Sequence, residues 1–598
     1  MHNEGGYVLL TVYVFLSALL ALLGVYFTVS EIELATTKHS KDSATGFYTA
    51  EAALNVRAKE IRDIFVGYNR PTGTTPSTST PCENGDNGSG DFVCDALALN
   101  NRTAMHYVEE AAGNPLMLTI PPGELYQNLN AQEYRYTVRS MAKNIEQRPE
   151  AILELRFKSR LVPLFQFVAF YNKDLEILPG PTMNLSGPIH TNGDLYLNAN
   201  NALNIAGQIT TAGDLYRGRK NDSSCNSKPV TALDPANPLA ILPSCASRTL
   251  VPNGDLTPWN GMVESGVDVV TVPEPDALHP TQGEIYWDKA DLRLMLRLNG
   301  SHVPITDANS STGIYVMNSD LSVNATETLA LHGCTGSIGG LSVGASSSFY
   351  NNREGAFIKM AEIDIQALLN CLHTTNWLGE GLHLDDNSEG GLVFHFSVNG
   401  PSSSGVNNYG VRVRNASELQ SSDGAAPDVI GMTVVSDQAF YTAGNYNSTN
   451  KIPAAILCDS INVLSNNWNL NDSTSTSSLN SRVASNTTIN AAFLSGTDST
   501  GGAEGAAGQG GGYNGGLENY PRFHESWSGR TLTYRGSFVS LNTPQHVDGA
   551  WVYGSPQYTA PGRNWDYDTD FNDASNLPPL SPRFVYLRQE LFVRDFEQ

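Results

Sequence analysis

The stretch YVLLTVYVFLSALLALLGVYFTV, residues 7–29, decides the fold of the N-terminal part of the chain. It holds 23 consecutive residues without a charged side chain. As a helix it would extend roughly 34 Å, enough to cross a bilayer core of about 30 Å. A secretory signal peptide would need a basic start, a shorter apolar core and a small-residue cleavage site, and residues 1–6 contain no Lys or Arg. We therefore expect a retained apolar helix, with side chains that include Tyr7, Leu10, Phe15, Leu19, Leu23 and Phe27.

The helical pattern continues beyond the apolar run. Apolar residues recur at intervals of three and four, with charged residues between them, at Phe47, Ala50, Leu54, Ala58, Ile61 and Phe65. This period predicts an amphipathic helix. One helix from Tyr7 to Phe65 would be about 90 Å long and suits the core of a helical filament. The alternative is a plain signal anchor followed by a short helix beside the membrane.

The composition of the remaining chain favours strands over helices. Charged residues make up 16% of the sequence, whereas Gly, Asn, Ser and Thr are abundant, which is typical of short strands joined by turns. We expect an α+β protein that is mainly β, with more than one core in 598 residues. The net charge of −24 argues against nucleic acid as a partner, because phosphate binding needs a basic surface.

Two stretches follow the expected helix at a strand period. Residues 133–140 and 151–158 alternate apolar and polar side chains and predict an antiparallel pair. The polar stretch 71–90 is interpreted as a flexible linker or loop.

An internal repeat is the clearest signal in the body. Residues 183–196, MNLSGPIHTNGDLY, return as LNIAGQITTAGDLY at residues 203–216. A period of roughly 20 residues matches one turn of a parallel β-helix. Because two copies also occur in ordinary meanders, the pattern predicts a body that is β-helix-like without excluding a meander.

The N-terminal region resembles the PilX-type minor pilins of type IV pili. The residues that carry the resemblance are 6–10 (GYVLL), 31–34 (EIEL) and 46–54 (GFYTAEAAL), and patches of the C-terminal half are similar to the bodies of large PilX-domain proteins. The resemblance implies cleavage of a short leader after Gly5 or Gly6, insertion of the helix among other pilins, and strands that pack on its second half. The chain departs from the pattern because its leader lacks basic residues and no Glu stands at the fifth mature position.

The spacing of the seven cysteines indicates in which cellular compartment the body folds. Six form pairs close in sequence, namely Cys82 with Cys94, Cys225 with Cys245 and Cys334 with Cys371, and Cys458 is left over as a buried thiol. Disulfides in an oxidising compartment explain this spacing, and seven reduced core cysteines are the alternative. Lys38 and Lys41 follow the apolar run, which by itself would place the body in the cytoplasm. We give the paired cysteines more weight and expect a membrane-anchored, exported protein.

The best ligand candidate is the acidic segment around Asp566, Asp568 and Asp570. Oxygen side chains at alternate positions suit Ca²⁺, but the segment lacks the glycine and the distal glutamate of an EF-hand loop. A solvated acidic loop is the alternative and is slightly favoured over a calcium site. No nucleophile motif is present, so no catalytic residue and no other cofactor is assigned.

These observations divide the chain into a leader at 1–6, a membrane or filament helix at 7–66, a linker with pilin-like strands at 67–160, and a β-rich exported body at 161–598. The first hypothesis is a structural minor pilin at or near a filament tip, which acts in assembly, initiation and adhesion. Its partners would be other pilins, the inner membrane before assembly, and a tip adhesin or a surface glycan. The alternatives are a membrane-tethered adhesin outside any pilus and a β-helix enzyme acting on polysaccharides through acidic pairs such as Asp385 with Asp386.

Overall fold

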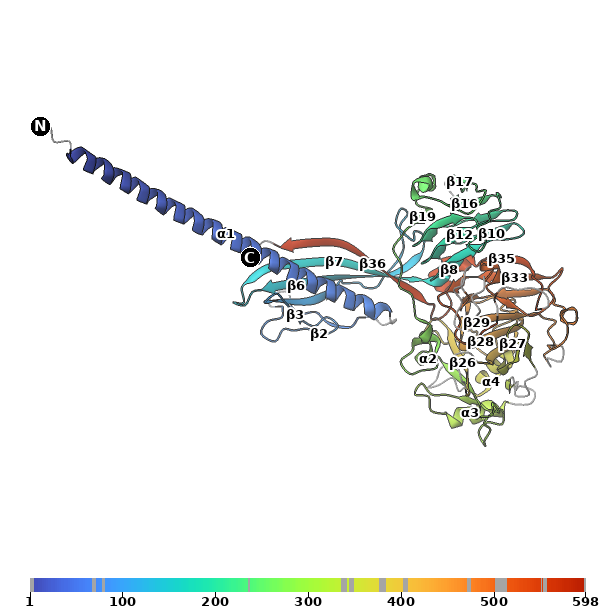
Figure 1. Cartoon of the computed structure of the whole chain (residues 1–598). Helices are drawn as coiled ribbons and strands as arrows, with labels where there is room; N and C mark the ends of the chain where they lie inside the picture. Colours follow the sequence, from blue (N-terminus) through green and yellow to red (C-terminus); the bar gives the residue numbers. More distant parts are fainter. Residues whose placement is uncertain are drawn as a thin grey trace. The chain divides into compact units, whose positions relative to one another are not determined.

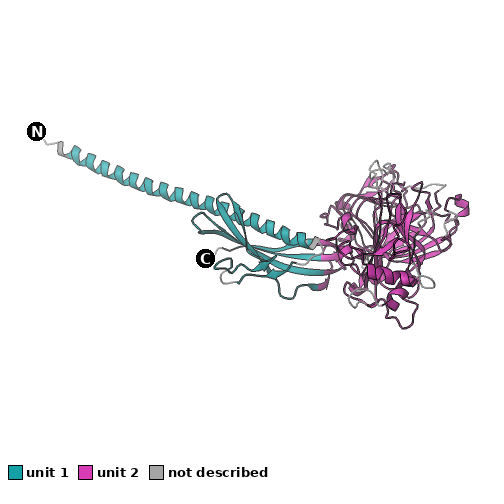
Figure 2. Cartoon of the chain, turned by 90° about the horizontal axis from the view of Figure 1, so that it is seen from below, with its two compact units in different colours: residues 1–116, 132–160, 586–598 teal, residues 117–131, 161–585 magenta. Residues whose placement is uncertain are grey.

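The computed structural model describes residues 5–66, 71–77, 81–234, 237–334, 341–343, 349–375, 383–401, 407–470, 475–498, 500, 514–549, 551 and 557–595. The chain forms two compact units, drawn in different colours in Figure 2. Unit 1 contains residues 1–116, 132–160 and 586–598, and unit 2 contains residues 117–131 and 161–585.

Unit 1 is built on one helix, α1 (Gly5–Val66), which confirms the single long helix predicted from the sequence (Figure 1). Its 62 residues extend about 93 Å. In the second half the buried residues recur at intervals of three and four, as an amphipathic helix requires. They are Gly46, Thr49, Ala50, Ala53, Leu54, Arg57, Ala58 and Ile61.

A sheet covers this second half of α1 in unit 1 (Figure 1). Its order is β3 (Asp95–Leu99), β4 (Arg102–Glu110), β6 (Asn130–Lys143), β7 (Pro149–Pro163) and β36 (Arg583–Asp595), and β5 (Leu116–Thr119) pairs with β6 off this path. The pairs β3–β4 and β4–β6 are antiparallel. β6 and β7 contain the two predicted strands and are joined by the turn 144–148, in which the Asn144 amide donates to the Arg148 carbonyl.

Two expectations about the boundaries of unit 1 need correction. The last strand, β36, was assigned to the body, but residues 586–598 belong to unit 1, where the strand pairs beside β7. The stretch 71–90 is also more than a flexible linker in its described part. It forms β1 (Gly73–Thr74) and β2 (Ser89–Gly90), which pair antiparallel, and a disulfide joins Cys82 to Cys94.

Unit 2 begins with three short strands in each turn of the chain. The first turn contains β8 (Ala169–Tyr171), β9 (Leu175–Ile177) and β10 (Met183–Leu185). The second contains β11 (Ile189–Thr191), β12 (Leu195–Leu197) and β13 (Leu203–Ile205), and the third contains β14 (Ile209–Thr211), β15 (Leu215–Arg217) and β16 (Val230–Asp234). Equivalent strands pair in parallel, so Met183 lies beside Leu203 and Leu195 beside Leu215. The two copies of the sequence repeat therefore lie in register on successive turns.

The stack continues with strands from the far end of the chain. A parallel series runs through β20 (Leu292–Arg297), β26 (Leu392–Asn399), β28 (Met432–Tyr446), β29 (Ala454–Leu464), β31 (Ala492–Ser495), β34 (Phe538–Ser540), β8, β11, β14 and β19 (Val263–Ser265). Buried side chains form one column along it: Leu292, Phe394, Val434, Ile456, Phe493, Phe538, Ala169, Ile189, Ile209 and Val263. The first turn of the body thus lies between the second turn and a strand near residue 540.

Further strands pair with this stack. β27 (Tyr409–Ala416) pairs in parallel with β25 (Lys359–Asp364) and with the second half of β28, and β32 (Arg522–Phe523) pairs with β29. β30 (Thr487–Asn490), β33 (Thr531–Gly536) and β35 (Gly562–Tyr567) are parallel neighbours. Shorter elements are β21 (Ile314–Val316), β22 (Leu341–Val343), β23 (Tyr350–Asn351), β24 (Ala356–Phe357), α2 (Ile285–Asp288), α3 (Ala325–Gly333) and α4 (Ile365–Thr375).

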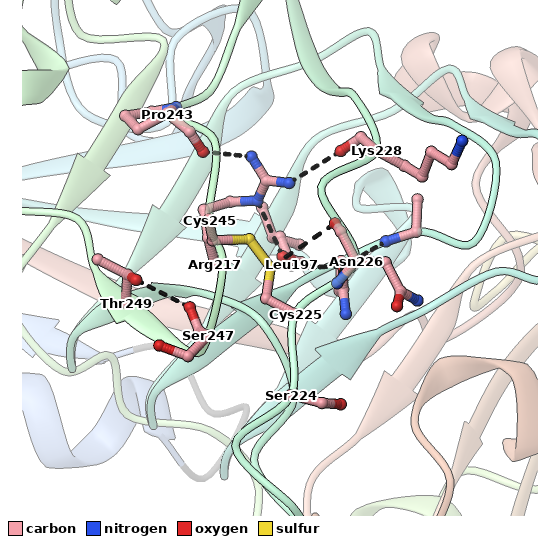
Figure 3. The surroundings of a disulfide bond; sticks show 12 residues. Leu197, Arg217, Ser224, Cys225, Asn226, Lys228, Pro243, Cys245, Ser247 and Thr249 are labelled. Atoms are coloured by element: carbon pink, nitrogen blue, oxygen red, sulfur yellow. Dashed lines mark hydrogen bonds between the residues drawn. A yellow bond between two sulfur atoms is a disulfide. The ribbon is translucent and has the colours of Figure 1, made fainter.

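A loop region closes the β19 end of the stack. β17 (Asn237–Ile241) and β18 (Thr249–Leu250) pair antiparallel with β16 and β15, and a disulfide joins Cys225 to Cys245 (Figure 3). The Arg217 guanidinium lies beside it and donates to the carbonyls of Leu197, Pro243 and Lys228 at 3.1, 2.6 and 3.0 Å. Antiparallel strands at the end of a parallel stack protect its edge from pairing with other chains.

Candidate functional site: the N-terminal helix

The first half of α1 is apolar and has no packing partner in the described chain. The exposed fraction is 76% at Tyr7, 73% at Phe15 and 51% at Leu19. Leu10, Leu23 and Phe27 are exposed as well. The helix is long and apolar enough to cross a membrane, with none of its most apolar window buried. Exposed apolar surface of this extent marks a surface that a membrane or other protein chains cover.

The second half of α1 approaches its sheet closely because its buried face carries small side chains. Gly46 marks the closest approach, since a Cβ atom there would lie 2.5 Å from the Cβ of Glu150 on β7. Ala50 and Ala53 are fully buried and Leu54 is 1% exposed. Burying these side chains stabilises the helix against the sheet through the hydrophobic effect.

Arginines fix the position of the helix along the sheet. Arg102 on β4 pairs with Asp42 of α1 at 2.7 Å and with Glu150 of β7 at 2.8 Å. Arg594 on β36 donates to the Ser43 hydroxyl at 2.6 Å, and its guanidinium lies 5.4 Å from the centre of the Phe47 ring. These contacts hold the start of the packed half.

Arg57 ties the helix to the disulfide-bonded loop. Its guanidinium is buried and donates to the carbonyls of Asp91 and Val93 at 2.9 and 2.8 Å, and it pairs with Glu60 at 2.7 Å. The roles of Arg57 and Arg102 do not follow from the sequence pattern. The signal for Arg57 was a charged residue between Leu54 and Ala58, on the face that the periodicity assigned to the core.

The acidic segment near the C-terminus has protein partners for all three carboxylates. Asp566 accepts hydrogen bonds from the Ser186 amide and hydroxyl at 2.7 and 2.8 Å. The Lys451 ammonium lies 2.8 Å from an Asp568 oxygen and 2.7 Å from an Asp570 oxygen. The described residues contain no group of three or more His, Cys, Asp or Glu side chains placed to hold a metal ion. A lysine is thus the counter-ion of Asp568 and Asp570, and Ca²⁺ binding by this segment stays a prediction.

The cysteines pair as the sequence predicts. Disulfides join Cys82 to Cys94, Cys225 to Cys245 and Cys334 to Cys371, and Cys458 is a buried thiol. Each bond closes a loop and so limits the unfolded chain. The acidic pair considered for catalysis lies on a turn, where Asp385 is exposed and Asp386 accepts a hydrogen bond from the Ser388 hydroxyl at 2.8 Å.

The proposed leader lies partly outside the described residues. Residues 1–4 are not described, and α1 begins at Gly5. Cleavage after Gly5 or Gly6 therefore stays a prediction.

Comparison with known proteins gives few matches. No family model matches the chain, and no curated protein matches it. The solved structure of the competence-associated pilin ComZ from Thermus thermophilus aligns with 93% of this chain and 98% of its own at 12% identity, with a TM-score of 0.25. At that TM-score the likeness carries no argument. The resemblance to PilX-type pilins stays a prediction.

Proposed function

We propose that the chain is a pilin-like structural subunit of a type IV pilus or a related filament. One observation carries the proposal: a single helix is divided into an apolar half that none of the described residues covers and a half that packs on a sheet. The resemblance to minor pilins implies the same division, in which the first half of the helix packs against other subunits and the second half packs against its own domain.

The mechanism is packing without turnover. Before assembly the apolar half, residues 7–29, lies in the inner membrane, where a charge-free helix is stable. In the filament the same side chains pack against the helices of other pilins. Both environments keep these side chains out of water, and exposing a Leu, Val or Phe to water instead would cost about 1.5–3 kcal/mol each.

The size of unit 2 bears on its place in the filament. Residues 161–585 would crowd one another if every subunit carried them, so we place this chain as a minor subunit at or near the tip. There it would act in assembly, initiation and adhesion. The disulfides agree with an extracellular location, because such bonds persist in oxidising compartments.

Mass spectrometry of sheared surface filaments tests this proposal. We expect the chain to co-purify with the filaments and its first peptide to begin at Gly6 or Tyr7. A chain that remains in the membrane fraction with Met1 intact would instead support a membrane-tethered adhesin.

A further inference from the structure

We propose that a cavity of about 520 Å³ in unit 2 binds an uncharged saccharide. It lies at β20, β26 and β28, which are consecutive parallel strands of the stack. Its volume falls in the range of small-molecule sites, about 300–1,000 Å³. The residues that line this cavity have no part in the role proposed for α1.

One wall of the cavity is apolar. Met295 and Met317 line it and belong to a buried cluster with Trp287 and Tyr315. Leu321, with an exposed fraction of 42%, lines it as well. Thioether and aliphatic side chains adapt to irregular shapes, and they suit the C–H face of a sugar ring.

The rest of the lining is polar, and part of it is already ordered. Asp437 is 9% exposed, and its two oxygens accept hydrogen bonds from Ser397 and Gln438, each at 2.7 Å. The Asn407 side chain donates to the side-chain oxygen Oε1 of Gln438 at 3.1 Å. A carboxylate can accept about four hydrogen bonds, so Asp437 retains capacity for hydroxyl groups while its position is fixed.

Two further polar side chains are available to a ligand. Arg297 and Asn399 lie opposite each other on β20 and β26, and both line the cavity. Within the described part of the chain, the Arg297 guanidinium makes no hydrogen bond or ion pair and lies 5.2 Å from the Tyr315 ring centre. The side-chain amide of Asn399 also has no hydrogen-bond partner among the described residues. Both groups offer donors at the edge of the apolar wall.

Charge selects among ligand classes. One cation, Arg297, and one anion, Asp437, line the cavity, so its formal charge is balanced. A phosphate-bearing ligand needs a concentration of positive charge that is absent from this lining. Mixed donors and acceptors beside an apolar wall match a ligand with hydroxyl edges and a C–H face. A neutral sugar has both.

Ligand-observed NMR and calorimetry on the purified full chain test the proposal. The chain is kept in a detergent without sugar groups, and the probes are neutral trisaccharides of glucose, mannose, galactose and N-acetylglucosamine, together with a uronic acid trimer and a glucosamine trimer. We expect at least one neutral trimer to bind. Arg297→Gln and Asn399→Ala should each weaken it about tenfold, because each removes a hydrogen bond to the ligand.

Matched controls separate the site from general damage. Arg530→Gln and Asn309→Ala change exposed or half-exposed side chains outside this lining and should leave binding unchanged. Failure of all neutral trimers to bind at millimolar concentration would overturn the proposal. So would a preference for the charged trimers, or equal losses in the control variants. The outcome is independent of filament assembly, because the assay uses the isolated chain.

Discussion

The two halves of α1 have the same backbone and different relations to the rest of the protein. Residues 7–29 are apolar on every side and exposed, whereas between residues 46 and 61 one face is buried and lined with small side chains. The first half adds nothing to the packing of unit 1, and the second half holds unit 1 together. The comparison shows that the longest apolar run in the sequence, residues 7–29, does not pack in the core of either unit.

The largest expected effect is the loss of packing in the second half. Leu54→Ala removes a side chain that is 1% exposed and should destabilise unit 1 by about 2–5 kcal/mol. Hydrogen exchange of the β4 and β6 amides measures this loss. Val56→Ala, at 44% exposure on the same helix, should cost about 0.5 kcal/mol or less. Equal costs for the two variants would contradict the assignment of the buried face.

A charge in the first half should weaken membrane insertion and leave the stability of unit 1 unchanged. Leu19→Lys places an ammonium near the middle of the apolar run and should disfavour membrane insertion by about 3 kcal/mol, or about 100-fold. Exchange of the β4 and β6 amides should not change. Partition of the chain between membrane and soluble fractions measures the change in membrane insertion. Asn55→Lys, on the exposed side of the packed half, is the control, and a similar loss there would refute the distinction.

Gly24 and Gly46, the two glycines in the interior of the helix, offer a sharper comparison. Gly46→Ala forces a Cβ atom against Glu150 and should destabilise unit 1 by about 1–3 kcal/mol despite the higher helix propensity of alanine. Gly24 has no atom within 4 Å of its Cβ position, so Gly24→Ala should leave unit 1 unchanged. Both variants are compared by hydrogen exchange. An unchanged Gly46→Ala protein would mean that the helix can move away from β7 without cost.

The smallest expected effect depends on pH. Burial, and secondarily the Arg57 guanidinium, lower the pKa of His106 below its ordinary 6.5. The unfolded chain then binds a proton that the folded chain does not, so stability is complete above about pH 6.5 and falls as the pH decreases below it. The slope should be at most about 1.4 kcal/mol per pH unit. His106→Gln should reduce the slope, while the buried His190, His395 and His524 of unit 2, whose pKa values are also lowered by burial, keep their own contributions. His39→Gln, on the exposed part of α1, should leave the slope unchanged; denaturant unfolding at pH 5 and 7 decides.

The sequence predicted the elements whose signals are local. The helix followed from a period of three to four residues, the pair 133–140 and 151–158 from alternation, and the stacked turns at 183–216 from a repeat of constant length. The nearest cysteines also proved to be bonded partners. Each of these signals is contained in fewer than about 60 residues.

The remaining features depend on contacts between distant segments. β36 pairs beside β7, and β34 pairs with β8, although hundreds of residues separate the partners. No period in the sequence encodes such a return. The contact of Lys451 with Asp568 and Asp570 is hidden from the sequence for the same reason, since the lysine lies far from both carboxylates along the chain. The cavity beside Asp437 also lies at strands β20, β26 and β28, and the sequence does not predict that these strands are neighbours.

The central claim is that the exposed half of α1 packs against the helices of other filament subunits. Photo-crosslinking in intact filaments tests it most directly, with a photoreactive phenylalanine analogue at Phe15 and, as a control, at Asn309 of unit 2. We expect crosslinks from position 15 to other pilins and none to them from position 309. Filaments that contain the chain but give no crosslink to another subunit from position 15 would contradict it.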